Sequence, residues 1–122
     1  MYVYSFEKLD VWIEAKNFAK QIYTLTSKFP ESEKFGLTVQ LRRAAISIAS
    51  NIAEGSTRNN NKDKAHFTTI AFGSAVEVLN QLIISCELGF ITEAEYIELR
   101  TQIESITNKL NALRNYQFQK TN

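Results

Sequence analysis

The residues of this chain that could take part in chemistry are few and scattered. His66 is the only histidine and Cys86 the only cysteine. Asp63 and His66 stand three positions apart, which is the spacing of half a di-iron site in a helical bundle. Such a site needs two carboxylate–histidine pairs and two further carboxylates. We therefore interpret Asp63 as a residue that stabilises a helix start, and we predict no metal site and no cofactor.

Nucleophilic and phosphate-binding motifs are also missing from the sequence. Cys86 falls on an apolar stripe, so we expect a buried structural thiol rather than a nucleophile. One histidine offers no Ser-His-Asp or Cys-His arrangement, and the segment "FGS" lacks the pattern of a phosphate-binding loop. The combination of Glu54, Glu77 and His66 forms no recognisable catalytic set. The sequence predicts a protein that is not an enzyme, with no catalytic residues and no small-molecule substrate.

Charge is distributed unevenly along the chain, although the net charge is only +1. A basic segment with two acidic residues contains Arg42, Arg43, Arg58, Lys62 and Lys64. The segment 77–104 holds six acidic residues and one basic residue. The five basic residues are our candidate nucleic-acid contacts, because lysine and arginine neutralise phosphates. Two alternatives are that the basic segment meets the acidic segment of a neighbouring subunit, or that both are simply solvated.

The two adjacent arginines must point in different directions on a helix. Consecutive helical residues are separated by about 100°, so Arg42 and Arg43 cannot share one carboxylate within the chain. We expect one of them to pair with a residue such as Glu77 or Glu54. The other is then free for phosphate or for a neighbouring subunit.

Four helices can position these residues. The chain has 122 residues with only 4 glycines and 1 proline, which favours long helices over a β-rich fold. Apolar stripes predict helices over about residues 7–28, 37–54, 62–88 and 92–115, with Gly55 as a left-handed helix end, a Thr92–Glu95 capping box and a frayed tail over 117–122. The predicted fold is all-α, an up-down-up-down antiparallel four-helix bundle forming a single domain over 1–122. The stripes are Val11, Ala15, Phe18, Ile22, Leu25 and Phe29 in the first helix, and Phe72, Ala75, Leu79, Leu82 and Cys86 in the third.

The second helix, "QLRRAAISIASNIAEG", is unusually apolar around its circumference. Its core stripe consists of Leu41, Ala45, Ile48 and Ile52. A second stripe of small and apolar residues either is covered by the bundle itself or forms a contact with another subunit. We predict an oligomer interface here, made of Arg43, Ile46, Ala49, Ser50, Ala53 and Glu54.

The cysteine count, the N-terminal residues and the hydropathy predict where in the cell the protein is found. The single cysteine cannot form an internal disulfide, the N-terminus lacks the pattern of a signal peptide, and no window approaches ~18 consecutive apolar residues. We expect a cytoplasmic protein with no membrane partner. The aromatic residues Tyr2, Tyr4, Phe6 and Trp12 either stack on bases or hold the N-terminus against the bundle.

Three segments carry a family resemblance: "FEKLDVWIEAKNFAKQIYTLTSKFP", "GLTVQLRRAAISIASNIAEGSTR" and "FGSAVEVLNQL…CELGFI". They resemble the four-helix-bundle proteins that are encoded by intervening sequences of bacterial 23S ribosomal RNA genes and are often labelled ribosomal proteins. That family is similar in turn to the accessory proteins of diversity-generating retroelements. The resemblance implies a homopentameric ring without enzymatic activity, associated with structured RNA or a nucleic-acid-processing protein.

The chain departs from the family pattern at one position. The family commonly has proline where this chain has Ala49, and proline would remove a helical hydrogen bond and bend the helix. We therefore expect a straighter helix here. The sequence as a whole predicts a homo-oligomeric, RNA-binding accessory factor, or alternatively a protein–protein assembly module that binds no nucleic acid.

Overall fold

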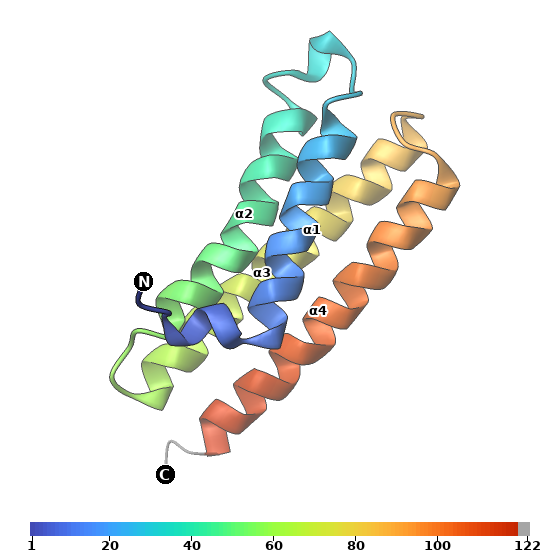
Figure 1. The fold of residues 1–122 in the computed structure, drawn as a ribbon. Coiled ribbons are helices and arrows are strands. Elements are labelled where there is room, and N and C mark those ends of the chain that lie inside the picture. Colours follow the sequence, from blue (N-terminus) through green and yellow to red (C-terminus); the bar gives the residue numbers. More distant parts are fainter. Residues whose placement is uncertain (120–122) are drawn as a thin grey trace.

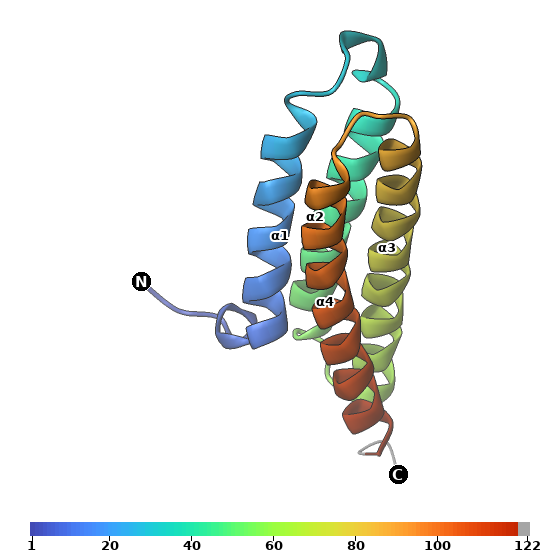
Figure 2. The same cartoon turned by 90° about the vertical axis from the view of Figure 1, so that its right-hand side faces the viewer.

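The structure is a computed structural model that describes residues 1–119 (Figure 1). Four long helices run antiparallel in the predicted up-down-up-down order, and no strand occurs in this range. Neighbouring helices in the sequence are neighbours in space, and α1 closes the bundle against α4 (Figure 2). The prediction of an all-α, antiparallel four-helix bundle is confirmed. The elements are η1 (Ser5–Lys8), α1 (Asp10–Thr26), η2 (Glu31–Glu33), α2 (Leu37–Gly55), α3 (Asn61–Glu87) and α4 (Glu93–Gln119).

One hydrophobic core joins all four helices. The stripes predicted for the first and second helices are buried throughout, which confirms both. Because α2 is rich in alanine and serine, α3 approaches it closely, and the Ser47 and Ser74 hydroxyls lie 2.8 Å apart across the contact. Packing is most extensive between α2 and α3, and it is sparse between α1 and α4. The largest fully buried apolar side chains are Phe18, Ile22, Leu41, Ile48, Leu82, Ile103, Ile106, Leu110 and Val78.

The stripe predicted for the third helix is shifted relative to the structure. Ala75 and Leu82 are buried as expected, but Cys86 is only partly buried at the edge of the core. The true inward face of α3 consists of small and polar residues as well as large apolar ones. Several isoleucines and valines of α3 consequently remain exposed. The buried α3 residues are Ala65, Thr68, Ala71, Ala75, Val78, Gln81, Leu82 and Ser85.

The first helix starts later than predicted. A short 3-10 turn, η1, precedes it, and the backbone of Leu9 is extended (φ −74°, ψ 125°), so that α1 begins at Asp10 instead of Glu7. The Glu7 carboxylate accepts a hydrogen bond from the backbone N–H of Tyr4 at 2.8 Å, which stabilises the turn. This break lets the N-terminal segment fold across the end of α1 and α2 (Figure 1).

The two glycines near helix ends have different roles. Gly89, with φ 79°, is a left-handed residue that follows Leu88, the C-cap of α3. The prediction of that role for Gly55 was wrong, because Gly55 is the last residue of α2 and its φ is not positive. A Cβ at Gly55 would lie 2.8 Å from the Cβ of Phe67, so this glycine permits the close approach of α3.

The fourth helix also differs from its prediction at one end only. The Thr92–Glu95 capping box is confirmed by reciprocal hydrogen bonds of 2.9 and 3.1 Å. The tail was predicted to fray from residue 117, yet α4 continues to Gln119, and the buried Gln117 accepts a hydrogen bond from Thr68 at 2.8 Å. The remainder of the predicted tail lies outside the described residues.

Helix α3 is unusually hydrophobic for a bundle helix. An 18-residue window has a mean hydropathy of 1.4, and 33% of that window is buried. By length and composition alone, α3 could therefore cross a membrane, although the core helix of a soluble protein can meet the same criterion. Its apolar character arises because residues on its outer face are apolar in addition to those on its inner face.

Candidate assembly surface and basic residues

A groove runs along the surface between α1 and α2. We call it the α1–α2 groove; its volume is about 630 Å³. Short side chains on α2 create it, because alanine and serine leave the space beside α1 unfilled. Its α2 wall consists of Ile46, Ala49, Ser50 and Ala53, and the rest is lined by Phe6, Trp12, Lys16, Ala19, Lys20, Tyr23 and Thr24.

Aromatic and cationic side chains organise the α1 side of the groove. The Phe6 and Trp12 rings meet edge to face with centroids 5.0 Å apart. The Lys16 ammonium lies 5.1 Å from the centre of the Trp12 ring. Sequence analysis missed this wall, although Trp12, Lys16 and Tyr23 recur at spacings of four and seven that place them along one side of a helix.

Arg42 belongs to the internal structure of the bundle. Its guanidinium lies 4.6 Å from the centre of the Tyr23 ring and donates a 2.8 Å hydrogen bond to the Thr26 hydroxyl. A weaker bond of 3.4 Å reaches the carbonyl of Tyr23. These contacts join α2 to α1, so Arg42 is the member of the arginine pair that is used within the chain. It pairs with neither Glu77 nor Glu54, contrary to the expectation.

The six predicted interface residues lie on one side of α2. Ile46, Ala49, Ser50 and Ala53 all line the α1–α2 groove, and Ile46 is 43% exposed. Arg43 and Glu54 are exposed further around the helix. Glu54 contacts Arg58 at 3.4 Å. The structure thus places the predicted residues together, next to an unfilled apolar surface.

The five candidate nucleic-acid contacts do not form one patch within a single chain. Arg42 and Arg43 lie in the first half of α2, whereas Arg58 follows its end, and the helix from Arg43 to Gly55 is about 18 Å long. Arg58 is engaged by Glu54 and stacks 4.5 Å from the centre of the Phe67 ring. Across residues 1–119, no ion pair involves Arg43, Lys62 or Lys64. Of the five candidates, these three have no ion pair within the described residues to break before they contact an external anion.

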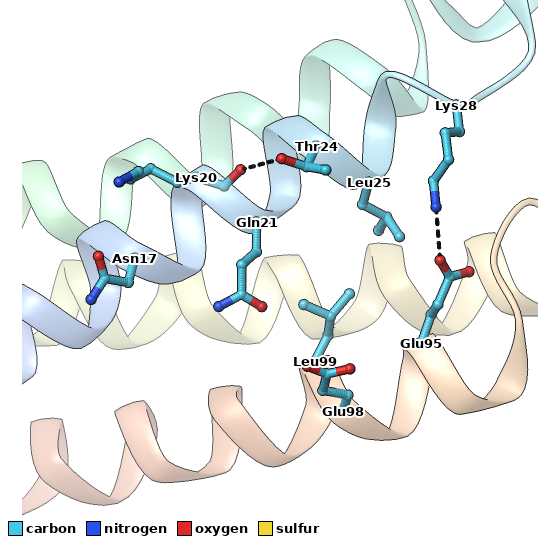
Figure 3. Close-up of a pocket in the computed structure, with 9 residues that line it drawn as sticks. All are labelled: Asn17, Lys20, Gln21, Thr24, Leu25, Lys28, Glu95, Glu98 and Leu99. Atoms are coloured by element: carbon cyan, nitrogen blue, oxygen red, sulfur yellow. Dashed lines mark hydrogen bonds and ion pairs between the residues drawn. The ribbon is translucent and has the colours of Figure 1, made fainter.

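A second hollow lies on the other side of α1, and we call it the α1–α4 cleft (Figure 3). Its volume is about 470 Å³. Lys28 and Glu95 form an ion pair of 3.0 Å across it, and the Gln21 and Gln102 amides exchange hydrogen bonds of 3.1 and 2.8 Å. The pKa of the Glu95 carboxyl is lowered, chiefly by the hydrogen bond from the Thr92 N–H and secondarily by Lys28. The lining residues are Asn17, Lys20, Gln21, Thr24, Leu25, Lys28, Glu95, Glu98 and Leu99.

The remaining chemically reactive residues stand apart from one another. Asp63 lies in the first turn of α3, where its N–H donates to the Asn60 side chain at 2.9 Å, and His66 is exposed one turn later. Among the residues that the structure describes, no three His, Cys, Asp or Glu side chains are grouped to hold a metal ion. The interpretation of Asp63 as a residue of the helix start agrees with this geometry.

The N-terminal aromatic residues are divided between two environments. Phe6 and Trp12 are partly buried and line the α1–α2 groove. Tyr2 and Tyr4 pack on each other edge to face at 4.9 Å but remain exposed. Tyr4 also stacks on Phe6 with ring centroids 6.2 Å apart, so the first residues reach the bundle through Phe6.

Comparison with solved structures shows the same bundle architecture elsewhere. A protein of unknown function from the S23 ribosomal protein family of Bacteroides thetaiotaomicron superposes with a TM-score of 0.80. The two chains share 24% sequence identity over 85% of this chain and 97% of the other. At that identity the likeness establishes the fold alone.

Comparison with curated proteins finds no match. Residues 7–112 match the family model of the 23S rRNA-intervening sequence protein. This range contains all of α1, α2 and α3 and most of α4. Because the match extends over most of the described bundle, the chain belongs to the 23S rRNA-intervening sequence protein family.

Proposed function

We propose that this protein is a non-enzymatic, cytoplasmic homo-oligomer, a pentamer as the family resemblance implies, that acts as an accessory factor binding RNA or a nucleoprotein. The observation that carries the proposal is the α1–α2 groove, whose α2 wall is formed by Ile46, Ala49, Ser50 and Ala53. The assembly is the primary function, and nucleic-acid binding follows from the residues that it leaves exposed.

The composition of the groove suits a protein–protein contact. Aromatic residues are enriched in the centres of interfaces, and small residues let an incoming helix approach closely. Trp12 and Phe6 supply aromatic surface, while Ala49 and Ala53 supply a flat floor. Exposed apolar surface of this kind typically marks an interaction site in a soluble protein.

The unpaired basic residues support the RNA-binding part of the proposal. Arg43, Lys62 and Lys64 have no ion-pair partner within residues 1–119, so they can bind phosphate without first breaking an internal contact. In a ring, each of them repeats once per subunit, and the separate basic positions of one chain become a recurring pattern. The family is named for intervening sequences of 23S rRNA, and this agrees with RNA as the partner.

The second candidate function is a protein assembly module without nucleic-acid binding. It is favoured by the net charge of +1 and by the distance between Arg43 and the lysines at the start of α3. On this alternative, the basic residues contact acidic residues of a neighbouring subunit.

Sedimentation velocity tests the assembly. The wild-type chain is expected to sediment as an oligomer, and Ala49→Glu is expected to sediment as a monomer because it places a charge in the groove. The matched control is Gln102→Glu, which adds a charge near the α1–α4 cleft and should leave the oligomer intact. A wild-type chain that is monomeric at micromolar concentration would overturn the proposal.

Filter binding of a structured RNA at several salt concentrations tests the second part. Lys62→Ala/Lys64→Ala should weaken binding and reduce the salt slope by about one for each phosphate that the variant no longer neutralises. The control Lys28→Ala/Lys34→Ala removes the same charge at the opposite end of the bundle and should have a smaller effect. Absence of binding at low salt by an intact oligomer would select the assembly module instead.

A further inference from the structure

We propose that the outer face of α3 seats in the α1–α2 groove of a second copy, so that the subunits associate head to tail. The inference rests on the proposed oligomer and identifies the surface that occupies the groove. The inference is supported by two apolar surfaces of one chain that have no partner within residues 1–119, one concave and one convex. We call the convex surface the α3 ridge and define it by Ile70, Val76 and Ile84, which are 39%, 48% and 42% exposed.

The shape of the α3 ridge permits close approach of another helix. Its residues fall within an arc of about 120° on α3. Gly73 lies within the same arc, and a Cβ added there would meet no atom within 4 Å. The ridge therefore has a flat centre between its apolar side chains, which allows another backbone to approach. This face also accounts for the high hydropathy of α3.

The lengths of the two surfaces agree. The α1 wall extends from Trp12 to Tyr23, which is about 16 Å along a helix. The ridge from Ile70 to Ile84 is about 21 Å long by the same measure. A single helix laid in the groove would thus place the central part of the ridge opposite the small residues of α2.

The charges of the two surfaces are complementary. The groove lining contains Lys16 and Lys20 and no carboxylate. From Ile70 to the end of α3, the charged residues are Glu77 and Glu87, with no lysine or arginine among them. None of these four side chains forms an ion pair within the described part of the chain. Each surface therefore offers the charges that the other lacks.

The two symmetrical pairings are less favourable. Ridge against ridge would bring Glu77 and Glu87 of two copies together on convex surfaces, and groove against groove would leave two hollows facing each other with lysines on both sides. Like charges across an interface are repulsive. Insertion of the ridge into lipid would require removing the same two glutamates from water, which is costly. The head-to-tail contact avoids the repulsion between like charges, and Lys16 and Lys20 of the groove offset the cost of removing the two glutamates from water.

A head-to-tail contact has a geometric consequence that a two-fold contact lacks. Each subunit uses one surface as a donor and a different one as an acceptor, so association continues until the ring closes. Two variants with defects in different surfaces can then complement each other, because one retains an intact groove and the other an intact ridge.

Mixing of two variants tests this directly. The groove variant is Ile46→Glu/Ala49→Glu and the ridge variant is Val76→Glu/Ile84→Glu; each alone is expected to be monomeric by sedimentation velocity. An equimolar mixture should form dimers, which contain one intact contact, and should not form the wild-type oligomer. The control Ile97→Glu changes a similarly exposed isoleucine on α4 and should leave the wild-type mass unchanged. Circular dichroism spectra and melting curves like those of the wild type establish that each variant is folded.

A charge exchange provides the second test, with substitutions that perturb folding less. Lys20→Glu and Glu77→Lys should each weaken association of the subunits about tenfold, and a chain carrying both changes should recover most of the affinity. A wild-type oligomer whose two variants give no dimer on mixing would overturn the ridge-in-groove contact while leaving the oligomer established. A monomeric wild type would instead overturn the proposed function. Flotation of the wild type with anionic vesicles, abolished in the ridge variant but not in the groove variant, would assign the ridge to lipid and overturn the contact.

Discussion

The two hollows on either side of α1 differ in whether the groups that line them have partners within the chain. In the α1–α4 cleft, the polar groups find partners across the gap: Lys28 pairs with Glu95, and Gln21 pairs with Gln102. In the α1–α2 groove, the lining is mostly aromatic and aliphatic, and its two lysines have no ion-pair partner within residues 1–119. Lys20 and Thr24 line both hollows, so a single helix separates the two environments.

This difference teaches that depth alone does not identify an interaction surface. Water can fill a polar cleft at little cost, because the groups there already have hydrogen-bond partners or can bond to water. Apolar surface has no such compensation and gains free energy only when another apolar surface covers it. The polar groups of the α1–α4 cleft thus have partners in a single chain, whereas the α1–α2 groove leaves apolar surface uncovered, which our proposal assigns to a contact with a second copy.

The largest effect is expected from the side chain that anchors α1 between the two hollows. Phe18 is fully buried in the core, so Phe18→Ala should lower the free energy of unfolding by about 3–5 kcal/mol. Denaturant unfolding at a fixed protein concentration measures this change. A loss below about 1 kcal/mol would mean that α1 is held mainly through the walls of its two hollows.

The two adjacent arginines should differ in their effect on stability. Arg42→Met removes the contact with the Tyr23 ring and the hydrogen bond to Thr26, and we expect a loss of about 1–2 kcal/mol. Arg43→Met should change stability by no more than about 0.5 kcal/mol, because the side chain is exposed and forms no ion pair within residues 1–119. Thermal unfolding of both variants provides the comparison. Equal losses would contradict the assignment of Arg42 as the internal residue.

Replacing the polar residues of the α1–α4 cleft by apolar ones should promote association between copies of the chain. In Gln21→Leu/Gln102→Leu both hydrogen-bonding partners are replaced, so stability should change by about 0.5 kcal/mol or less. The exposed leucines should instead cause additional, concentration-dependent association beyond the wild-type oligomer. Light scattering over a dilution series measures it. If this variant keeps the wild-type mass at every concentration, apolar character alone does not distinguish the two hollows.

The smallest expected effect is on the pH dependence of stability, and it arises from Glu95 in the α1–α4 cleft. Because the folded state lowers the pKa of Glu95, its charged form stabilises the fold above the unfolded-state pKa, near 4.5, and this contribution is lost as the pH falls through the folded pKa. The partly exposed ion pair limits the effect to about 0.5 kcal/mol. Glu95→Gln should therefore flatten the decline in stability below pH 4.5. An unchanged acid profile in unfolding experiments would show that the ion pair and the cap contribute nothing.

The sequence predicted most of the fold because apolar periodicity fixes the inward face of a helix. The stripes of α1 and α2 are clear, since each has large apolar residues on one side. The stripe of α3 was displaced because its inner and outer faces are both apolar, and periodicity cannot choose between them. The start of α1 was missed because the break at Leu9 depends on a local turn held by Glu7.

The candidate site was predictable in part for a related reason. The α2 wall of the groove was found because Ile46, Ala49 and Ala53 exceed what one core face requires. The α1 wall was not found, because Trp12 and Tyr23 also fit an ordinary amphipathic helix. The five basic residues are near one another in the sequence, but the part of α2 that follows Arg43 separates the arginine pair from the others. Nearness along a helix is therefore a poor guide to a shared patch.

The uneven packing of α1 has a consequence for local unfolding of the bundle. Helices α2, α3 and α4 form a continuous block, whereas α1 has extensive contact with α2 only and little with α4. Local unfolding is easier in a helix that packs on fewer neighbours, so the backbone amides of α1 should exchange their hydrogens for deuterium sooner than those of α3, which packs extensively on both α2 and α4. A neighbour seated in the α1–α2 groove would add contacts to α1, and each subunit would thereby slow hydrogen exchange in this helix of the next.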